Sequence, residues 1–301
     1  MSEARPITVS SRLADLAARV AGFAGEASPG PEHATDIEGL LAIHSRRPTA
    51  IEPVLYQPSF CIILRGGKCV QLGDRRLDFG PGDAVVISHH LPVLAKITVA
   101  SEHEPFSSLA FDLDLGLARE LHDRVGEPTS SRSLSRSLET GPAPPALVDA
   151  MVRLFDLVGR RRDGEILAPL LRREIHYRLL SAPQGETLRQ LLQESSHASQ
   201  IARAISLLRR DFSQPLAVPD LARAAGMSDS SFHEHFRSLT GTTPLQYLKS
   251  LRLLEARRLI REGKHNVTEA ALGVGYQSPT QFSREYSRHF GHSPRHDLTS
   301  A

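Results

Sequence analysis

Four polar side chains share one face of a predicted helix in the C-terminal third of the chain. They are Ser230, His233, Glu234 and Arg237, which lie three, four and seven positions from the first, a spacing that a helix brings to one side. Guanidinium groups suit the O6 and N7 atoms of guanine, and a carboxylate can accept from the cytosine amino group. Hydroxyls and other Arg side chains more often contact phosphates, which position a protein without specifying sequence. Taken alone, the face could equally be an ordinary solvated helix surface.

The same arrangement recurs fifty positions further along the chain. Segment 228–244 aligns with segment 278–294 at matching Ser, aromatic, Gly and Pro positions, and a repeat at a fixed offset outweighs a single motif. The inward aromatic pairs are Phe232 with Phe236 and Phe282 with Tyr286. The outward positions of the second copy are Thr280, Ser283, Arg284 and Ser287. Because the inward residues repeat while the outward ones differ, the pattern is typical of two units on one scaffold that contact different base sequences.

Each copy consists of a short helix, a glycine turn and a second helix, which is the outline of a helix-turn-helix unit. In the first copy Val218–Ala225 precedes Gly226, and in the second Thr268–Leu272 precedes Gly275. Glycine suits such turns because it adopts the left-handed backbone conformation at little cost. The sequence therefore predicts two helix-turn-helix units.

Capping residues and one long helix are expected to hold these units in place. Ser228 and Ser278 suit the N-caps of the outward-facing helices, and Pro279 suits the first helical position of the second. Pro244–Ile260 is apolar over more than half its circumference, which predicts a helix buried on two sides. Such a helix would join the units rigidly. Spacing matters because successive major-groove segments on one side of DNA lie about 34 Å apart.

The first half of the chain changes to short β-type runs separated by Gly, Pro and Asp turns, a pattern typical of a β-sandwich or β-barrel. The runs are Leu40–Ile43, Phe60–Leu64, Cys69–Leu72, Ala84–Ser88, Ala95–Val99 and Ser107–Phe111. Segment Phe79–Ile87, with its Pro-Gly-Asp turn, resembles the strand–turn–strand segment of cupin-type barrels. Helices over Ala146–Gly159 and Glu165–Leu180 are predicted to form a hairpin that packs either on the barrel or against a partner chain.

The barrel lacks the residues that metal-dependent chemistry would need. Segment 60–72, which matches the metal-binding strand of such barrels, contains no His, Asp or Glu, although carboxylate and imidazole ligands suit the expected metals. His89 and His90 have no evident partner ligands and are expected in a turn or at a pocket rim. We therefore predict no metal, no cofactor and no catalytic residue. A small-molecule sensor or a dimerisation module fits the barrel better than an enzyme.

The two cysteines, Cys61 and Cys69, are too few for a disulfide framework and fit a reducing compartment. If Gly66 and Gly67 form a two-residue hairpin turn, Cys61 pairs with Leu72 and the two thiols point to opposite faces of the sheet. An intrachain disulfide is then not expected. Both residues are interpreted as small apolar core residues. The alternative for Cys61 is a thiol that senses oxidants or electrophiles.

Composition and charge agree with a soluble protein of two domains. The 301 residues contain no apolar run of about 18 residues that would span a membrane, and residues 1–10 do not resemble a signal segment, so we expect a cytoplasmic protein. The net charge of +2 is unevenly distributed. Residues 199–301 contain fourteen Lys and Arg against nine Asp and Glu, a net of +5, which leaves −3 for the rest. The basic part is expected to meet a polyanion, although such a charge also fits a plain solvated surface.

These features together resemble the AraC/XylS family of bacterial transcription regulators. The resemblance lies in Leu221–Pro244, in the helix Leu245–Ile260 and in the segment Gly275–Pro294. Segments Tyr56–Cys61, Gly66–Lys68 and His90–Pro92 are similar to the cupin-like N-terminal domain of one subgroup. The resemblance implies seven C-terminal helices and promoter binding with activation through RNA polymerase. The base-contacting positions that it implies are Ser230, His233, Glu234, Thr280, Ser283 and Arg284. It also implies an effector bound in the barrel.

The chain departs from the family pattern at three positions. Many members have Arg or Gln where this chain has Glu234, and the acid is expected to pair with Arg237 or another neighbour. Ala270 replaces a common Ile, and Pro279 stands where a polar contact is usual.

The sequence thus predicts an α+β chain of two domains. We expect an N-terminal helix and linker over 1–36, a cupin-like sensor and dimerisation domain over 37–185, a linker over 186–200 and a double helix-turn-helix domain over 201–298. The expected partners are double-stranded DNA, RNA polymerase, a small-molecule effector and a second copy of the chain. A barrel enzyme and a non-specific DNA-binding protein are the alternatives.

Overall fold

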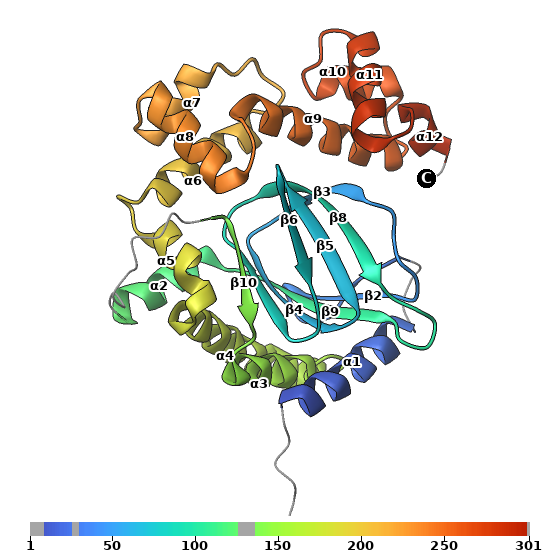
Figure 1. Ribbon diagram of the computed structural model, residues 1–301, viewed down its shortest axis with the longest axis vertical. Helices are drawn as coiled ribbons and strands as arrows, with labels where there is room; N and C mark the ends of the chain where they lie inside the picture. Colours follow the sequence, from blue (N-terminus) through green and yellow to red (C-terminus); the bar gives the residue numbers. More distant parts are fainter. Residues whose placement is uncertain (1–8, 26–29, 126–135, 300–301) are drawn as a thin grey trace, which may run out of the picture.

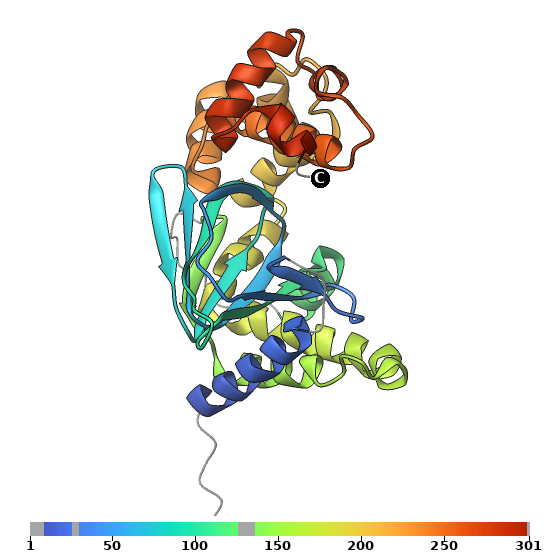
Figure 2. The ribbon, with the colours of Figure 1, turned by 90° about the vertical axis from the view of Figure 1, so that its right-hand side faces the viewer.

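The computed structural model describes residues 9–25, 30–125 and 136–299. A β-rich half with helices along one side lies below an all-helical half, and the two are in contact (Figures 1 and 2). The predicted α+β class and the two-domain architecture are confirmed.

The β-rich half consists of two antiparallel sheets that face each other. The six-stranded sheet has the order β1-β2-β9-β4-β7-β10, and the four-stranded sheet has the order β3-β8-β5-β6. Strand β3 is therefore an edge strand, paired only with β8. The strands are β1 (Glu32–Ala34), β2 (Leu40–Ser45), β3 (Glu52–Tyr56), β4 (Ser59–Arg65), β5 (Gly67–Leu72), β6 (Arg75–Phe79), β7 (Asp83–Ile87), β8 (Leu91–Val99), β9 (Phe106–Asp112) and β10 (Leu138–Pro142).

Alternation along the strands produces two apolar layers. Side chains such as Ile63 and Val70 point between the sheets and form an inner core, because successive residues of a strand face opposite sides. Neighbouring residues such as Ile62 and Val86 point outward from the six-stranded sheet into a second core shared with helices. These helices are α1 (Val9–Gly25), α2 (Leu115–Val125), α3 (Pro145–Phe155), α4 (Arg161–Ser181) and α5 (Glu186–Leu192), with a 3₁₀ turn at Pro183–Gly185 between the last two.

The predicted helical hairpin is present as α3 and α4, and it packs on the barrel. Leu147, Leu154 and Ile175 are buried in the core shared with the sheet. The segment expected as a linker, 186–200, contains α5, whose Leu188 belongs to the same core. Most of the Ser- and Arg-rich segment 129–137 lies outside the described residues.

The predicted hairpin turn at Gly66 and Gly67 is wrong. Strand β4 pairs with β7 and β9, whereas β5 pairs with β6 and β8, so the two glycines take the chain from one sheet to the other. Gly66 has φ +78°, and a Cβ there would lie 2.4 Å from the Val99 carbonyl oxygen. A close crossover between sheets and a tight hairpin both require glycine. The local sequence therefore could not distinguish the crossover from the hairpin.

One cysteine faces the space between the sheets and the other faces outward. The two thiols thus point in opposite directions, as predicted, although the strands pair differently from the prediction. Cys61 in β4 faces the space between the sheets. Cys69 in β5 pairs with Asp78 of β6 and Lys96 of β8 on the outer side. Both thiols are free.

The C-terminal half contains seven described helices that form two apolar cores. They are α6 (His197–Arg210), α7 (Val218–Ala225), α8 (Asp229–Thr240), α9 (Pro244–Arg261), α10 (Val267–Gly273), α11 (Pro279–Phe290) and α12 (Pro294–Thr299). The first core includes Leu248 and Leu251 of α9, and the second includes Leu253 and Ile260. Helix α9 therefore belongs to both cores, in agreement with the prediction of a helix buried on two sides.

Candidate nucleic-acid interface

The first helix-turn-helix unit is fixed by local capping and by an aromatic core. Gly226 ends α7 with φ +71°, and the Ser228 hydroxyl accepts from the backbone N–H of Ser231 at the start of α8. Phe232 and Phe236 are fully buried with ring centroids 5.4 Å apart. Tyr247 of α9 packs edge-on against Phe236 at 5.5 Å. These contacts hold α8 with its opposite face outward.

That opposite face carries all four predicted residues of the first unit. Ser230, His233, Glu234 and Arg237 are exposed on α8. Arg237 does not pair with Glu234 as was expected. Its guanidinium instead lies 3.7 Å from the carboxylate of Asp74 in the β5–β6 turn, so the last turn of the outward helix faces an acid from the barrel.

The second unit repeats the scaffold, but a side-chain hydrogen bond that the first unit lacks helps to hold it in place. The Ser278 hydroxyl accepts from the Gln281 N–H, and Pro279 occupies the first helical turn of α11. Phe282 and Tyr286 are fully buried. The Tyr286 hydroxyl, which Phe236 lacks, donates to buried Asp297 at 2.6 Å. Asp297 also pairs with Arg257 and Arg261 of α9 at 3.3 and 2.7 Å, so α12 is tied to the joining helix.

The structure separates the four predicted residues of the second unit into two groups. Thr280 and Arg284 are exposed. Ser283 and Ser287 are half-buried, and their hydroxyls donate to the carbonyl oxygens of Pro279 and Ser283, each at 2.9 Å. This engages both hydroxyls within α11. Arg288, one turn after Arg284, is also exposed. It was not predicted as a contact, because the corresponding position of the first copy is Ser238.

Helix α9 sets the distance between the two outward helices. Its 18 residues make a rod about 27 Å long. In Figure 1 it runs across the top of the molecule, with α8 near one end and α11 near the other. The rod is comparable to the ~34 Å between successive major-groove segments on one side of DNA.

A bend between β7 and β8 connects the barrel to the first unit. His89 is buried, and its Nε2 donates to the carbonyl oxygen of Ala198 in α6 at 3.0 Å, while its Nδ1 accepts from the Ser88 hydroxyl at 2.8 Å. His90 Nδ1 accepts from Arg209 at 3.2 Å. The two histidines lie in a turn, as predicted, but they contact the helical half instead of lining a pocket rim.

The pKa values of these two histidines agree with their neutral roles. Burial lowers the pKa of His89 to about 4. Burial, the Arg209 charge and His89 lower the pKa of His90 to about 4. Both side chains are therefore uncharged at neutral pH, with Nδ1 free to accept, as the hydrogen bonds to their Nδ1 atoms require.

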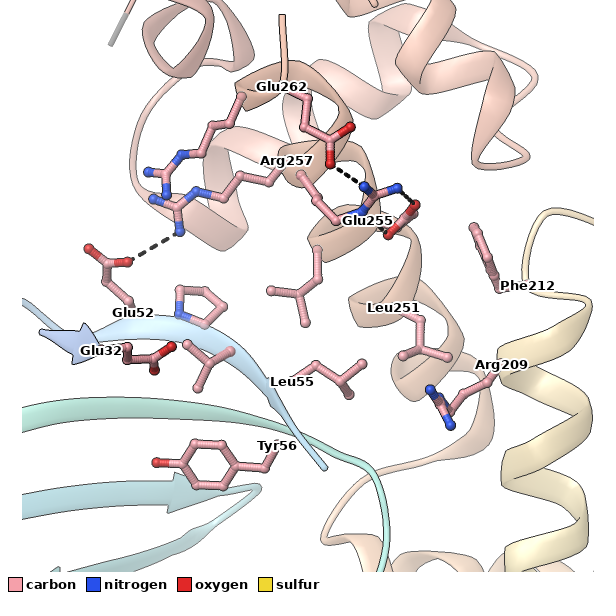
Figure 3. A pocket seen from close by; sticks show the side chains of 15 residues that line it. Glu32, Glu52, Leu55, Tyr56, Arg209, Phe212, Leu251, Glu255, Arg257 and Glu262 are labelled. Carbon is pink, nitrogen blue, oxygen red and sulfur yellow. Dashed lines mark hydrogen bonds and ion pairs between the residues drawn. The ribbon is translucent and has the colours of Figure 1, made fainter. Parts of the chain in front are cut away.

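A cleft of about 710 Å³ lies between β3 and α9, with Arg209 of α6 at one end (Figure 3). Leu55 of β3 and Leu251 of α9 line it from opposite sides (Figure 3). At the other end Arg257 approaches Glu52 of β3 at 3.4 Å. The cleft is thus an interface between the two halves, apolar in the middle and charged at its ends.

A second cavity, of about 320 Å³, lies between the two sheets of the barrel. Apolar side chains line most of it, together with Cys61, Lys68 and Tyr56. Glu32, Leu55 and Tyr56 line both this cavity and the cleft. Burial raises the pKa of the Cys61 thiol, which keeps it protonated at neutral pH and makes it a weak nucleophile.

Within the described part of the chain, no three His, Cys, Asp or Glu side chains are arranged to hold a metal ion. None of the described helices is long and apolar enough to cross a bilayer.

Comparison with known families decides the affiliation. Residues 36–187, half of the chain, match the model of the AraC-type transcriptional regulator N-terminus, and residues 221–299 match a helix-turn-helix domain model. The chain belongs to the AraC family of transcription regulators. The AraC-type N-terminal match covers the barrel with α3, α4 and the start of α5, and the helix-turn-helix match covers most of the helical half.

Individual relatives extend this comparison. The HTH-type transcriptional activator RhaS of Salmonella typhimurium is 29% identical over 144 residues, which is 48% of this chain and 51% of RhaS. The chain thus spans about half the length of the curated relatives it matches. An apo ToxT variant from Vibrio cholerae covers 88% of this AraC-type chain and 99% of its own, with a TM-score of 0.59 and 11% identity. ToxT bound to an unsaturated fatty acid gives a TM-score of 0.56 at 10% identity. These likenesses show the same fold over both halves.

Proposed function

We propose that this AraC-family chain binds DNA sequence-specifically through two adjacent major-groove segments. The observation that supports it most is the duplicated unit, in which α8 and α11 each turn a polar face outward from a buried aromatic pair. Arg284 and Thr280 of α11, and Ser230, His233 and Glu234 of α8, are proposed to contact bases. Arg237 is proposed to contact phosphate or base once it leaves Asp74. The hydroxyls of Ser283 and Ser287 can donate to DNA phosphates only if they give up their hydrogen bonds to the helix carbonyl oxygens.

We propose further that a small molecule bound in the barrel controls this activity. Support comes from the cavity between the sheets and from the three residues that it shares with the cleft beside α9. Occupation of the cavity would move the wall on which the DNA-binding half rests. Cys61 of β4 is proposed to line the effector site from the opposite sheet. A sensing role for its thiol is the weaker alternative, because its pKa is raised.

The regulator is proposed to act as an activator that contacts RNA polymerase in the cytoplasm. The likeness to RhaS, named as a transcriptional activator, supports activation. A homodimer is proposed through the barrel half, where α4 exposes Ile166 and Leu170.

A footprint on the DNA upstream of the protein's own gene tests the proposal. The full chain should protect two segments about one helical turn apart, at a stated salt concentration, because phosphate contacts make affinity strongly salt-dependent. A random duplex of equal length is the control. Equal affinity for both duplexes would contradict sequence-specific binding and favour a non-specific DNA-binding protein.

A further inference from the structure

The barrel cavity contains a lysine that forms no ion pair with a described carboxylate, although the charge of Glu32 acts on it. Lys68 lies on β5 and lines the cavity together with Val70, because residues two apart on a strand share a face. Its ammonium lies over the ring of Tyr56, 5.2 Å from the centroid. No carboxylate in the described part of the chain forms an ion pair with it. Glu32 and Asp112 also line the cavity, and the Asp112 carboxylate accepts instead from Gln57 at 3.0 Å.

The phenol of Tyr56, whose ring lies against the Lys68 ammonium, is buried without a hydrogen-bond partner among the described residues. The hydroxyl of Ser108, on β9 next to β4, is also buried and lies beside the Cys61 thiol. Burial raises the pKa of Tyr56 and of Cys61, so neither group supplies a negative charge to Lys68 at neutral pH. Buried polar groups in proteins nearly always have partners, and an uncompensated buried charge is costly. The partner is therefore expected from outside the chain.

Most of the remaining cavity lining is apolar, with Glu32, Gln57, Ser59 and Asp112 as its other polar residues. Its walls include Ile43, Ile63, Val70, Phe79 and Ile87 from both sheets. A volume of about 320 Å³ is at the lower end of the roughly 300–1,000 Å³ typical of small-molecule sites. The site thus joins one cationic end to an apolar chamber.

We propose that the barrel binds a small organic acid, with its carboxylate on Lys68 and Tyr56 and its apolar body between the sheets. This inference names the ligand class for the effector control proposed above and rests on it only for the regulatory consequence. The carboxylate accepts hydrogen bonds from the ammonium and the phenol, which supplies the missing charge. A neutral molecule of the same shape leaves the ammonium unpaired and binds more weakly.

Calorimetric titration of the full chain tests the proposal without DNA. The probes are benzoate, 3-phenylpropionate and octanoate, each paired with its primary amide, which keeps the shape and removes the charge. At least one acid should bind saturably at millimolar concentration or below, and its amide should bind at least about ten-fold more weakly, as expected for a charged hydrogen bond. Equal binding of acid and amide, or no binding of any acid, would overturn the proposal.

Variants locate the binding to this cavity. Lys68→Met should weaken binding of the acid roughly ten- to hundred-fold while leaving the amide unaffected, and Tyr56→Phe should weaken it roughly three- to ten-fold. The matched control is Lys96→Met, because Lys96 lies on the neighbouring strand and on the opposite face of the same sheet. If Lys68→Met does not fold, the affinity of Tyr56→Phe for the acid decides whether the acid binds in this cavity. Unchanged affinity in the folded variants would refute the assignment.

A footprint with and without the bound acid separates this inference from the proposed function. Binding of acid that leaves the footprint unchanged would uphold the site and contradict effector control. A specific footprint from a chain that binds none of the acids would uphold DNA binding and overturn the ligand class.

Discussion

The hydroxyl of Tyr247 donates a 2.7 Å hydrogen bond to the carbonyl oxygen of His90. The ring of Tyr247 is fully buried and packs on Phe236 in the first DNA-binding unit, whereas His90 belongs to the barrel. One residue of the joining helix therefore takes part in the core of the first unit and in the contact with the barrel. No described residue of the second helix-turn-helix unit (α10 and α11) makes a corresponding hydrogen bond to the bend at His89 and His90.

Tyr247→Phe is expected to loosen the contact between the two halves without disturbing either core. The variant removes one hydrogen bond, worth about 1 kcal/mol net, and keeps the ring. Hydrogen exchange of the amides in 88–91 should accelerate. Tyr276→Phe is the control, because its hydroxyl donates to Glu285 within the second unit at 2.8 Å. Equal acceleration in both variants would mean that the exchange reports general destabilisation.

Gly73→Ala is expected to force the barrel and the first unit apart. Gly73 has φ +59°, and a Cβ there would lie 1.9 Å from the carbonyl oxygen of Gly241 at the end of α8. Gly263→Ala is a matched control, since Gly263 has φ +68° and open space around its Cβ position. Both variants bear the strain of a left-handed alanine, roughly 1 kcal/mol, but only the first adds a clash. Small-angle scattering should show a more extended particle for Gly73→Ala alone. An unchanged radius of gyration would contradict the close approach.

Asp74→Asn is expected to raise the affinity for DNA modestly. The change removes the carboxylate that lies 3.7 Å from Arg237 and so frees the guanidinium to contact phosphate. Exposed ion pairs contribute about 0–1 kcal/mol, so the gain should stay below about five-fold. Gel-shift titration at two salt concentrations measures it. The double variant with Arg237→Ala should show no such gain, and a gain that persists there would assign the effect to net charge.

Arg284→Ala is expected to lower the affinity for the specific site by about 1–3 kcal/mol and to relax preference at one base position. Arg284 is exposed in the middle of the outward face of α11. Arg161→Ala on the barrel removes the same charge far from that face and is the control. Selection from a randomised site gives the preference directly. Equal losses on specific and random duplexes would make Arg284 a phosphate contact.

Stability is expected to fall as the pH is lowered from about 6.5 towards 4, in part because of His89. Burial lowers the pKa of this residue to about 4 from 6.5, so below pH 6.5 the unfolded chain binds a proton that the folded chain does not. The contribution is fully present above pH 6.5 and is lost at about 1.4 kcal/mol per pH unit until the folded pKa is reached. His89→Gln should flatten this part of the urea-midpoint profile. A variant profile parallel to that of the wild type would contradict the assignment.

Local sequence predicted the helical half more completely than the barrel. Helix caps and glycine turns depend on only a few neighbouring residues. Those at Ser228, Ser278 and Gly226 occur where they were expected. Strands β1, β3, β6 and β10 were missed. Arg75–Phe79 alternates charged with apolar residues, and Pro53 within Glu52–Tyr56 argues against a strand.

Contacts between distant parts of the chain could not be predicted from the sequence. Lys68 is polar and follows two glycines, so it was placed beside a turn, whereas the crossover between sheets directs it into the cavity. The connection of His89 to Ala198 spans 109 positions, and no local pattern indicates it. The base-contacting roles on α8 and α11 remain predictions, although exposure now distinguishes Arg284 from Ser283.

Strand β3 forms ladder hydrogen bonds with β8 alone, and its residues separate the barrel cavity from the cleft beside α9. Displacing an edge strand breaks one ladder, whereas displacing an interior strand breaks two. The partition between the two compartments is therefore the most compliant part of the four-stranded sheet, together with the opposite edge. A molecule slightly larger than the chamber would bulge this partition towards α9. Under the effector control proposed above, ligand size, independent of affinity, would then set how far the joining helix is pushed.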